Sequence, residues 1–152
     1  MTFPMLRTEI AAQDRLPSPT VDRTLLSGVS VLVVEDEPDT RATLQAVLEQ
    51  YGARPTVVAT ATEALSVVRR SPPDVLLSDI VMPGQDGYAL IRDIRATIDA
   101  RRLPAAALSG HLDKNAEANA VDAGFQAFLT KPIEPTSLVH ALARLIHRGP
   151  IV

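Results

Sequence analysis

The sequence predicts an α/β fold in which five parallel strands alternate with five helices. Short apolar runs rich in Val, Leu and Ala recur along the chain, and segments with apolar residues at helical spacing lie between them. Each strand–helix unit has the length of a βαβ crossover, which implies a parallel sheet with helices on both faces. In addition, 46% of the 152 residues are hydrophobic, which is enough for one domain with a sizeable core.

The first half of the chain carries two strand–helix units. The apolar, β-branched run before Glu35 is typical of a strand, and Pro38 opens a helix because proline fits the first helical turn. Gly52 ends this helix. A shorter β-branched run is the second strand, and Thr60 or Thr62 caps the helix after it. The expected ranges are 29–34, 38–50, 54–59 and 63–70.

The second half carries three more units. The apolar run before Asp79 is typical of a strand buried on both faces, and a tight loop follows it. The fourth helix has a thin apolar face of Ala116, Ala120 and Val121, so we expect it to be loosely held. Pro135 opens the last helix. The expected ranges are strands at 74–78, 103–108 and 125–130, and helices at 88–96, 113–123 and from 135 onward.

The N-terminal residues do not share this pattern. Residues 1–27 contain three prolines and little apolar periodicity, so we expect a flexible extension or linker. The alternative is that they pack on the domain or mediate a homodimer. The folded domain is expected to span 28–148, with a short tail at 149–152.

Composition excludes several classes of function. The formal net charge is -3, which argues against direct binding of nucleic acid through a broad basic face. There is no cysteine, which excludes disulfides, thiolate catalysis and thiolate metal sites. No apolar run approaches the roughly 20 residues of a membrane span, and the N-terminus lacks the apolar segment of a signal peptide. The protein is therefore expected to be cytoplasmic.

Chemically active side chains follow four of the predicted strands. For this alternation we expect the flavodoxin-like strand order 2-1-3-4-5, with ligands bound at the carboxyl ends of the strands. Three crowded carboxylates repel one another unless a cation is present, and hard oxygen ligands suit Mg2+. The sequence therefore predicts a Mg2+ site beside a lysine and a hydroxyl. The residues expected there are Glu35, Asp36, Asp79, Ser109 and Lys131.

A site of this kind favours an anionic substrate, and a phosphoryl group fits. A carboxylate can attack phosphorus to give an aspartyl phosphate, and phosphoryl transfer mainly needs positioning and charge neutralisation. Asp79 is the best nucleophile, and Glu35 and Asp36 would hold the metal. Each residue alone also has a structural interpretation. Asp79 could cap the next turn, Glu35 could favour a helix N-terminus, and Lys131 could be a solvated surface lysine.

Four short motifs contain these residues. They are Val-Leu-Val-Val-Glu-Asp-Glu-Pro at 31–38, Leu-Leu-Ser-Asp-Ile-Val-Met-Pro-Gly at 76–84, Ala-Leu-Ser-Gly at 107–110 and Phe-Leu-Thr-Lys-Pro at 128–132. In this order and spacing they resemble the receiver domain of bacterial two-component response regulators. The resemblance covers residues 29 to about 147.

The resemblance implies a role for each site residue. Asp79 would be the phosphoacceptor. Asp36 would bind Mg2+ directly, Glu35 would act through water, and the backbone carbonyl of Val81 would complete the protein ligands. Ser109 would bind a phosphoryl oxygen. Two departures from the family pattern are mild, because neither removes a function: Glu35 stands where many members have aspartate, and glycine at position 110 stands where alanine is common.

The resemblance also implies a switch and partners. Lys131 would pair with the phosphoryl group, and its bond to Pro132 is usually cis in the family. Phe128 matches the switch aromatic, although it has no hydroxyl to hold an inward state. A histidine kinase or phosphotransfer domain would supply the phosphoryl group. A downstream protein, which the sequence does not identify, would bind the surface of the fourth helix, fifth strand and last helix.

Two other functions remain as alternatives. Metal phosphohydrolases of the haloacid dehalogenase-like type usually carry a second acid two residues after the nucleophile, and here that residue is Val81. A receiver that acts only as a scaffold usually lacks an acid or the lysine, and neither is lost. We expect no output domain in the sequence, which leaves a stand-alone response regulator or a receiver of a hybrid histidine kinase.

Overall fold

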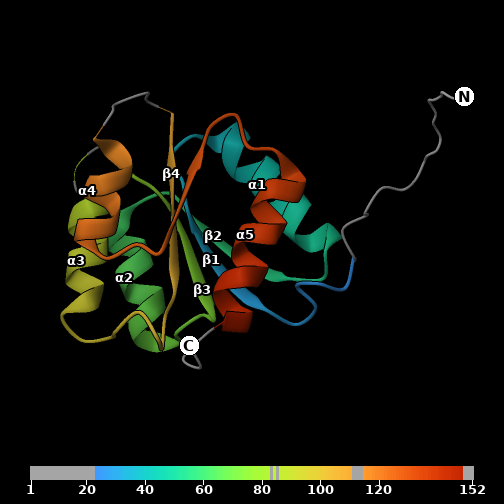
Figure 1. Cartoon of the computed structure of the whole chain (residues 1–152), viewed down its shortest axis with the longest axis horizontal. Coiled ribbons are helices and arrows are strands. Elements are labelled where there is room, and N and C mark those ends of the chain that lie inside the picture. Colours follow the sequence, from blue (N-terminus) through green and yellow to red (C-terminus); the bar gives the residue numbers. More distant parts are fainter. Residues whose placement is uncertain (1–22, 83, 85, 111–114, 149–152) are drawn as a thin grey trace, which may run out of the picture.

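The computed structural model describes residues 23–82, 84, 86–110 and 115–148 (Figure 1). Its five strands form one parallel sheet in the order β2-β1-β3-β4-β5, which confirms the predicted fold class and strand order. The strands are β1 (Ser30–Val34), β2 (Arg54–Val58), β3 (Val75–Asp79), β4 (Ala105–Ser109) and β5 (Ala127–Thr130). The helices are α1 (Pro38–Gln50), α2 (Ala61–Arg70), α3 (Gly87–Arg95), α4 (Ala116–Ala123) and α5 (Pro135–Arg148).

The helices cover both faces of the sheet. Figure 1 shows α2, α3 and α4 on one side and α1 and α5 on the other. Two aliphatic clusters fill the layers between helices and sheet, one under α2, α3 and α4 and one under α1 and α5. All residues of β3 are buried, as the apolar run before Asp79 predicts, and all residues of β4 are buried as well. The helices therefore enclose the central strands from both sides in close-packed layers.

Side chains fix where the helices begin. Glu37 accepts a hydrogen bond from the Thr40 amide at 2.7 Å at the start of α1, and Asp86 accepts one from Ala89 at 2.9 Å at the start of α3. Of the two threonines predicted to cap α2, the structure uses Thr60, whose hydroxyl accepts from the Glu63 amide at 3.1 Å. These caps fix where each helix starts after the loop at the carboxyl edge of the sheet.

The predicted inward face of α4 is partly wrong. Ala116, Ala120 and Ala123 are buried, but Val121 is 57% exposed. The buried residues recur at helical spacing, and Val121 lies on a different side of the helix. The predicted start at 113 lies outside the described residues. The packed face of α4 consists of alanines, so it is thin, as expected.

Strand β5 begins two residues later than predicted. The amide of Phe125 donates to the Ala120 carbonyl at 3.0 Å, so Phe125 closes the end of α4, and its side chain is buried beneath that helix. Gly124 makes this turn possible with a φ of 131°. The apolar character of Phe125 therefore belongs to the helix end and not to the strand.

Residues just before the expected boundary at 28 pack against the domain. Leu26, which the sequence assigns to the extension, is fully buried in the cluster under α1 and α5. Its amide donates to the Tyr51 carbonyl at 3.3 Å, and the Gly28 amide donates to Gly52 at 2.9 Å. Within the described part of the chain, no helix is long and apolar enough to cross a membrane.

Candidate functional site

The sheet brings the predicted site residues to one edge. Asp79 is the last residue of β3 and Ser109 the last of β4, and Lys131 comes directly after β5. Glu35 and Asp36 follow β1, which pairs with β3 in parallel, so that Val34 lies opposite Ser78. Parallel strands end at the same edge, and this is why segments far apart in sequence meet there.

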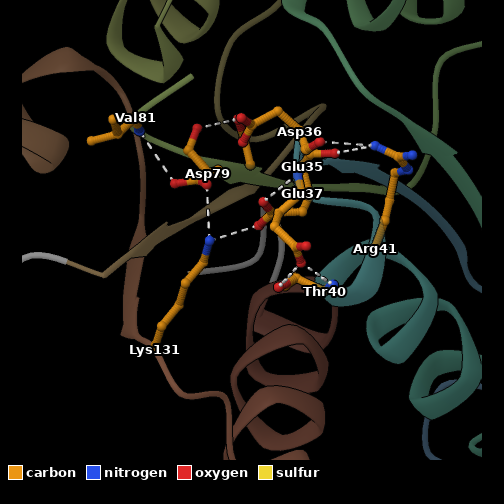
Figure 2. A network of polar contacts seen from close by, with 9 residues as sticks. Glu35, Asp36, Glu37, Thr40, Arg41, Asp79, Val81 and Lys131 are labelled. Carbon is orange, nitrogen blue, oxygen red and sulfur yellow. Dashed lines mark hydrogen bonds and ion pairs between the residues drawn. The ribbon is translucent and has the colours of Figure 1, made fainter. Parts of the chain in front are cut away.

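Lys131 joins two of the acids. Its ammonium Nζ lies 2.8 Å from Oε1 of Glu35 and 2.9 Å from Oδ2 of Asp79, and Figure 2 shows its side chain reaching both carboxylates. Burial of the ammonium lowers its pKa, but the bonds to Glu35 and Asp79 and their negative charges outweigh burial, and the net pKa is raised. Lys131 therefore stays positively charged at neutral pH.

Glu35 is a fully buried acid with spare acceptor capacity. Its Oε2 accepts a hydrogen bond from the Glu37 amide at 3.0 Å. Its Oε1 is close enough to Lys131 for an ion pair but lacks a hydrogen bond of good geometry. Burial and the charge of Asp79 raise the pKa of Glu35, and the contacts with Lys131 and Glu37 only partly oppose this. The carboxylate would gain from a further cation.

The acidic residues offer a coordination site. Glu35, Asp36 and Asp79 can each contribute one oxygen, and these oxygens lie within 4.8 Å of one another. Hard carboxylate oxygens are the ligands that Mg2+ prefers. Oε1 of Glu35 has the Lys131 ammonium as its partner and keeps acceptor capacity for a cation. The residues present therefore fit a Mg2+ ion.

The loop after β3 holds Asp79 in place. The Val81 amide donates to Oδ1 of Asp79 at 3.2 Å, and the loop returns so that the Gly87 amide donates to the Ile80 carbonyl at 2.8 Å. A Cβ atom at position 87 would lie 2.3 Å from the Asp79 carbonyl oxygen and 2.8 Å from the Ile80 Cα. Glycine is therefore required at 87, because the backbones approach too closely for any side chain.

Two further predicted residues lie where the sequence places them. Ser109 is buried at the end of β4, opposite Thr130 in the register of β4 and β5. Phe128 is half-buried and packs against the cluster under α2, α3 and α4. The peptide bond between Lys131 and Pro132 is cis, as the resemblance implies. The roles of Ser109 and Phe128 stay predictions.

One contact of the site was missed by sequence reasoning. Arg41, on α1, donates from Nη1 to the backbone carbonyl of Glu35 at 2.9 Å and to that of Asp36 at 3.3 Å (Figure 2). A hydrogen bond to backbone leaves no complementary charge or motif in the sequence. The available signal was the spacing, because an arginine one turn into α1 can reach back over the loop that precedes the helix.

Comparison with known proteins agrees with this geometry. Residues 31–143 match the family model of the response regulator receiver domain. An uncharacterised 14.6 kDa protein of Leptolyngbya boryana is 41% identical, over 75% of this chain and 87% of its own length. The response regulator Rre1 of Synechocystis is 33% identical over 79% of this chain, but this chain spans only 52% of Rre1.

A solved structure extends the comparison to three dimensions. The receiver domain of the sensor histidine kinase PA1611 from Pseudomonas aeruginosa superposes with a TM-score of 0.73. It is 34% identical, and the match covers 80% of this chain and 99% of that domain. That crystal structure has a magnesium ion coordinated in its active-site cleft. The family match, the strand order and the acidic site together show that this chain belongs to the receiver domain family of two-component response regulators.

Proposed function

We propose that this chain accepts a phosphoryl group on Asp79 in a Mg2+-dependent reaction. Receiver domains are signalling modules that interact with histidine kinases or phosphotransfer proteins, and we propose such a protein as the donor, in the cytoplasm. The proposal is carried by one observation. Asp79 ends the central strand with one carboxylate oxygen on Lys131, in the same cluster as Glu35 and Asp36.

In the proposed step, a carboxylate oxygen of Asp79 attacks the phosphorus of a phosphohistidine. The new O–P bond forms as the P–N bond breaks, and the departing imidazole nitrogen keeps the electron pair and takes up a proton. The product is an acyl phosphate on Asp79. Lys131 does not exchange a proton in this step, because its raised pKa keeps the ammonium charged. It neutralises charge on the phosphoryl oxygens.

The acidic residues would hold the metal. Asp36 and Asp79, the backbone carbonyl of Val81 and, through water, Glu35 would bind Mg2+, which supplies charge neutralisation for the phosphoryl oxygens. The hydroxyl of Ser109, at the end of the neighbouring strand, would donate a hydrogen bond to a phosphoryl oxygen. The same residues would support hydrolysis of the acyl phosphate, so the chain would catalyse only its own phosphorylation and dephosphorylation.

Phosphorylation would then change the surface formed by α4, β5 and α5. The packed face of α4 is made of Ala116, Ala120 and Ala123, so few apolar contacts hold this helix. Phe128 lies on β5 against the same cluster and would follow the movement of Ser109. A downstream protein, or a second copy of the chain in a homodimer, would bind this surface in one of its two states.

Intact-mass spectrometry tests the proposal. The protein is incubated with Mg2+ and acetyl phosphate, beside an Asp79→Asn variant and a sample with EDTA. We expect one labile phosphoryl adduct on the wild type alone. Fast self-hydrolysis could remove the adduct but would leave beryllofluoride binding intact. Folded protein that gains no adduct and also fails to bind beryllofluoride would therefore contradict the proposal. The chain would then act as a scaffold without phosphorylation.

A further inference from the structure

Arg41 contacts the acidic pair through the backbone. Arg41 is half-buried, and its guanidinium lies on the side of Glu35 and Asp36 away from Lys131 (Figure 2). One nitrogen, Nη1, donates to the carbonyl oxygens of both residues, at 2.9 Å and 3.3 Å. Arginine can do this because each terminal nitrogen carries two N–H groups in a fixed plane.

These two bonds fix the backbone on either side of Asp36. The carbonyl of Glu35 belongs to the peptide plane before the Asp36 Cα, and the carbonyl of Asp36 belongs to the plane after it. Each plane is rigid, so holding both oxygens restricts both dihedral angles of Asp36. The direction of its Cα–Cβ bond, and with it the reach of its carboxylate, is then set by Arg41.

Further hydrogen bonds join the rest of this loop to the first turn of α1. The Glu37 side chain accepts from Thr40 in the first turn of α1, and the Arg41 amide donates to the Glu37 carbonyl at 3.0 Å. The Glu37 amide in turn donates to Oε2 of Glu35. The backbone of Arg41 is therefore bonded to the same loop that its guanidinium contacts, and hydrogen bonds link the start of α1 to the acidic pair.

Binding to carbonyls also leaves the acids free to act as ligands. Lys131 pairs directly with the Glu35 and Asp79 carboxylates and competes with any cation for them. Arg41 adds a positive charge and positional order without occupying a carboxylate oxygen. We propose that Arg41 is a positioning residue for the divalent cation, acting through the backbone of Asp36. This inference rests on the proposed Mg2+-dependent function.

The test measures metal affinity directly. Mn2+ stands in for Mg2+, and free Mn2+ is counted by electron paramagnetic resonance during titration of the full chain without phosphodonor. We expect Arg41→Met to weaken Mn2+ binding about 10- to 100-fold, the usual effect of losing an outer-shell partner. Arg41→Lys should recover part of this loss, because an ammonium can still donate to a carbonyl. Urea unfolding in EDTA confirms that each variant is folded.

Arg54→Met is the matched control. Arg54 also donates to a backbone carbonyl, that of Gly28 at 3.3 Å, but it lies on β2 away from the acids. We expect its Mn2+ affinity to equal that of the wild type. In the acetyl phosphate reaction, Arg41→Met should raise the Mg2+ concentration at half-maximal rate, with the rate at saturating Mg2+ within about twofold of wild type.

The outcomes separate this inference from the proposed function. Wild-type Mn2+ affinity in folded Arg41→Met would overturn the role of Arg41 alone. An equal loss in Arg54→Met would also overturn it, because the effect would then be one of general stability. If the wild type itself binds no Mn2+, the metal site and the proposed Mg2+ dependence both fail. If the wild type binds Mn2+ but gains no phosphoryl group, only the proposed function fails.

Discussion

Lys131 stands between two carboxylates that would otherwise face each other. Its ammonium is within 3 Å of both Glu35 and Asp79, and Glu35 is buried strongly enough for its pKa to be raised. The ammonium of Lys131 therefore compensates the negative charge of both acids. At the scale of single residues, Lys131 thus offsets the charges of Glu35 and Asp79, and a metal ion would offset them further.

Removing that compensation should make stability depend on the metal. We expect Lys131→Met to lower the free energy of unfolding in EDTA by about 3 kcal/mol, because two buried acids lose their partner. Saturating Mg2+ should restore most of this loss by replacing the missing charge. Urea unfolding with and without Mg2+ measures both values, with Arg69→Met as an exposed control. Equal losses in EDTA and Mg2+ would show that Lys131 is not a counter-ion here.

The glycine after the Asp79 loop gives a second prediction at this scale. We expect Gly87→Ala to destabilise the fold by about 2–3 kcal/mol, because the added Cβ would overlap the backbone of Asp79 and Ile80. Gly110→Ala is the matched control, since its Cβ would meet only the Lys131 side chain at 3.7 Å. Thermal and urea unfolding compare the two. A Gly87→Ala variant as stable as Gly110→Ala would mean that the loop does not approach the strand so closely.

Side chains from α3 contact helix α4 at both of its ends. At its C-terminal end, Arg95 donates to the Gly124 carbonyl at 3.0 Å and to the Gln126 side chain at 3.0 Å, and Gln126 also donates to Gly124 at 2.7 Å. Near its N-terminal end, Tyr88 reaches the Ala116 carbonyl only at 3.4 Å. At the scale of elements, Arg95 therefore ties the C-terminal end of α4 to α3.

Hydrogen exchange tests how firmly Arg95 holds the C-terminal end of α4. We expect the amides of Gly124 and Phe125 to exchange more slowly than those at the start of α4, and Arg95→Met to remove most of that protection. Arg92→Met is the matched control, because Arg92 is an exposed arginine of α3, the helix that also carries Arg95. Unchanged protection of Gly124 in Arg95→Met would show that the arginine does not hold the helix end.

Helix α5 begins at an acid whose pKa is lowered. Glu134 accepts from the Thr136 hydroxyl and from the amides of Ser137 at 2.9 Å and Thr136 at 3.3 Å, which lowers its pKa to about 2. A lowered folded pKa stabilises the protein above the unfolded value of 4.5, and the stabilisation is lost as pH falls toward 2. The stability difference between wild type and Glu134→Gln should therefore shrink below pH 4.5. A difference that is constant with pH in urea unfolding would exclude this contribution.

At the scale of the whole molecule, the sequence predicted what depends on periodicity. Apolar runs mark where strands end, and parallel strands end at one edge, so Asp36, Asp79 and Lys131 could be placed together. Contacts set by tertiary packing could not be predicted. Val121 points outward because of how α4 is rotated, Leu26 is buried by contacts across the domain, and Arg41 bonds to backbone groups that have no sequence signature.

The parallel sheet brings the ends of β1, β3, β4 and β5 together into one acidic site that includes Asp79. The most direct test is to locate the acceptor. After reaction with acetyl phosphate and Mg2+, borohydride converts an acyl phosphate of aspartate to homoserine, which peptide mass spectrometry can locate. We predict homoserine at position 79 and at no other acid. Homoserine at Asp36, or at none of the aspartates despite an intact-mass adduct, would contradict the account.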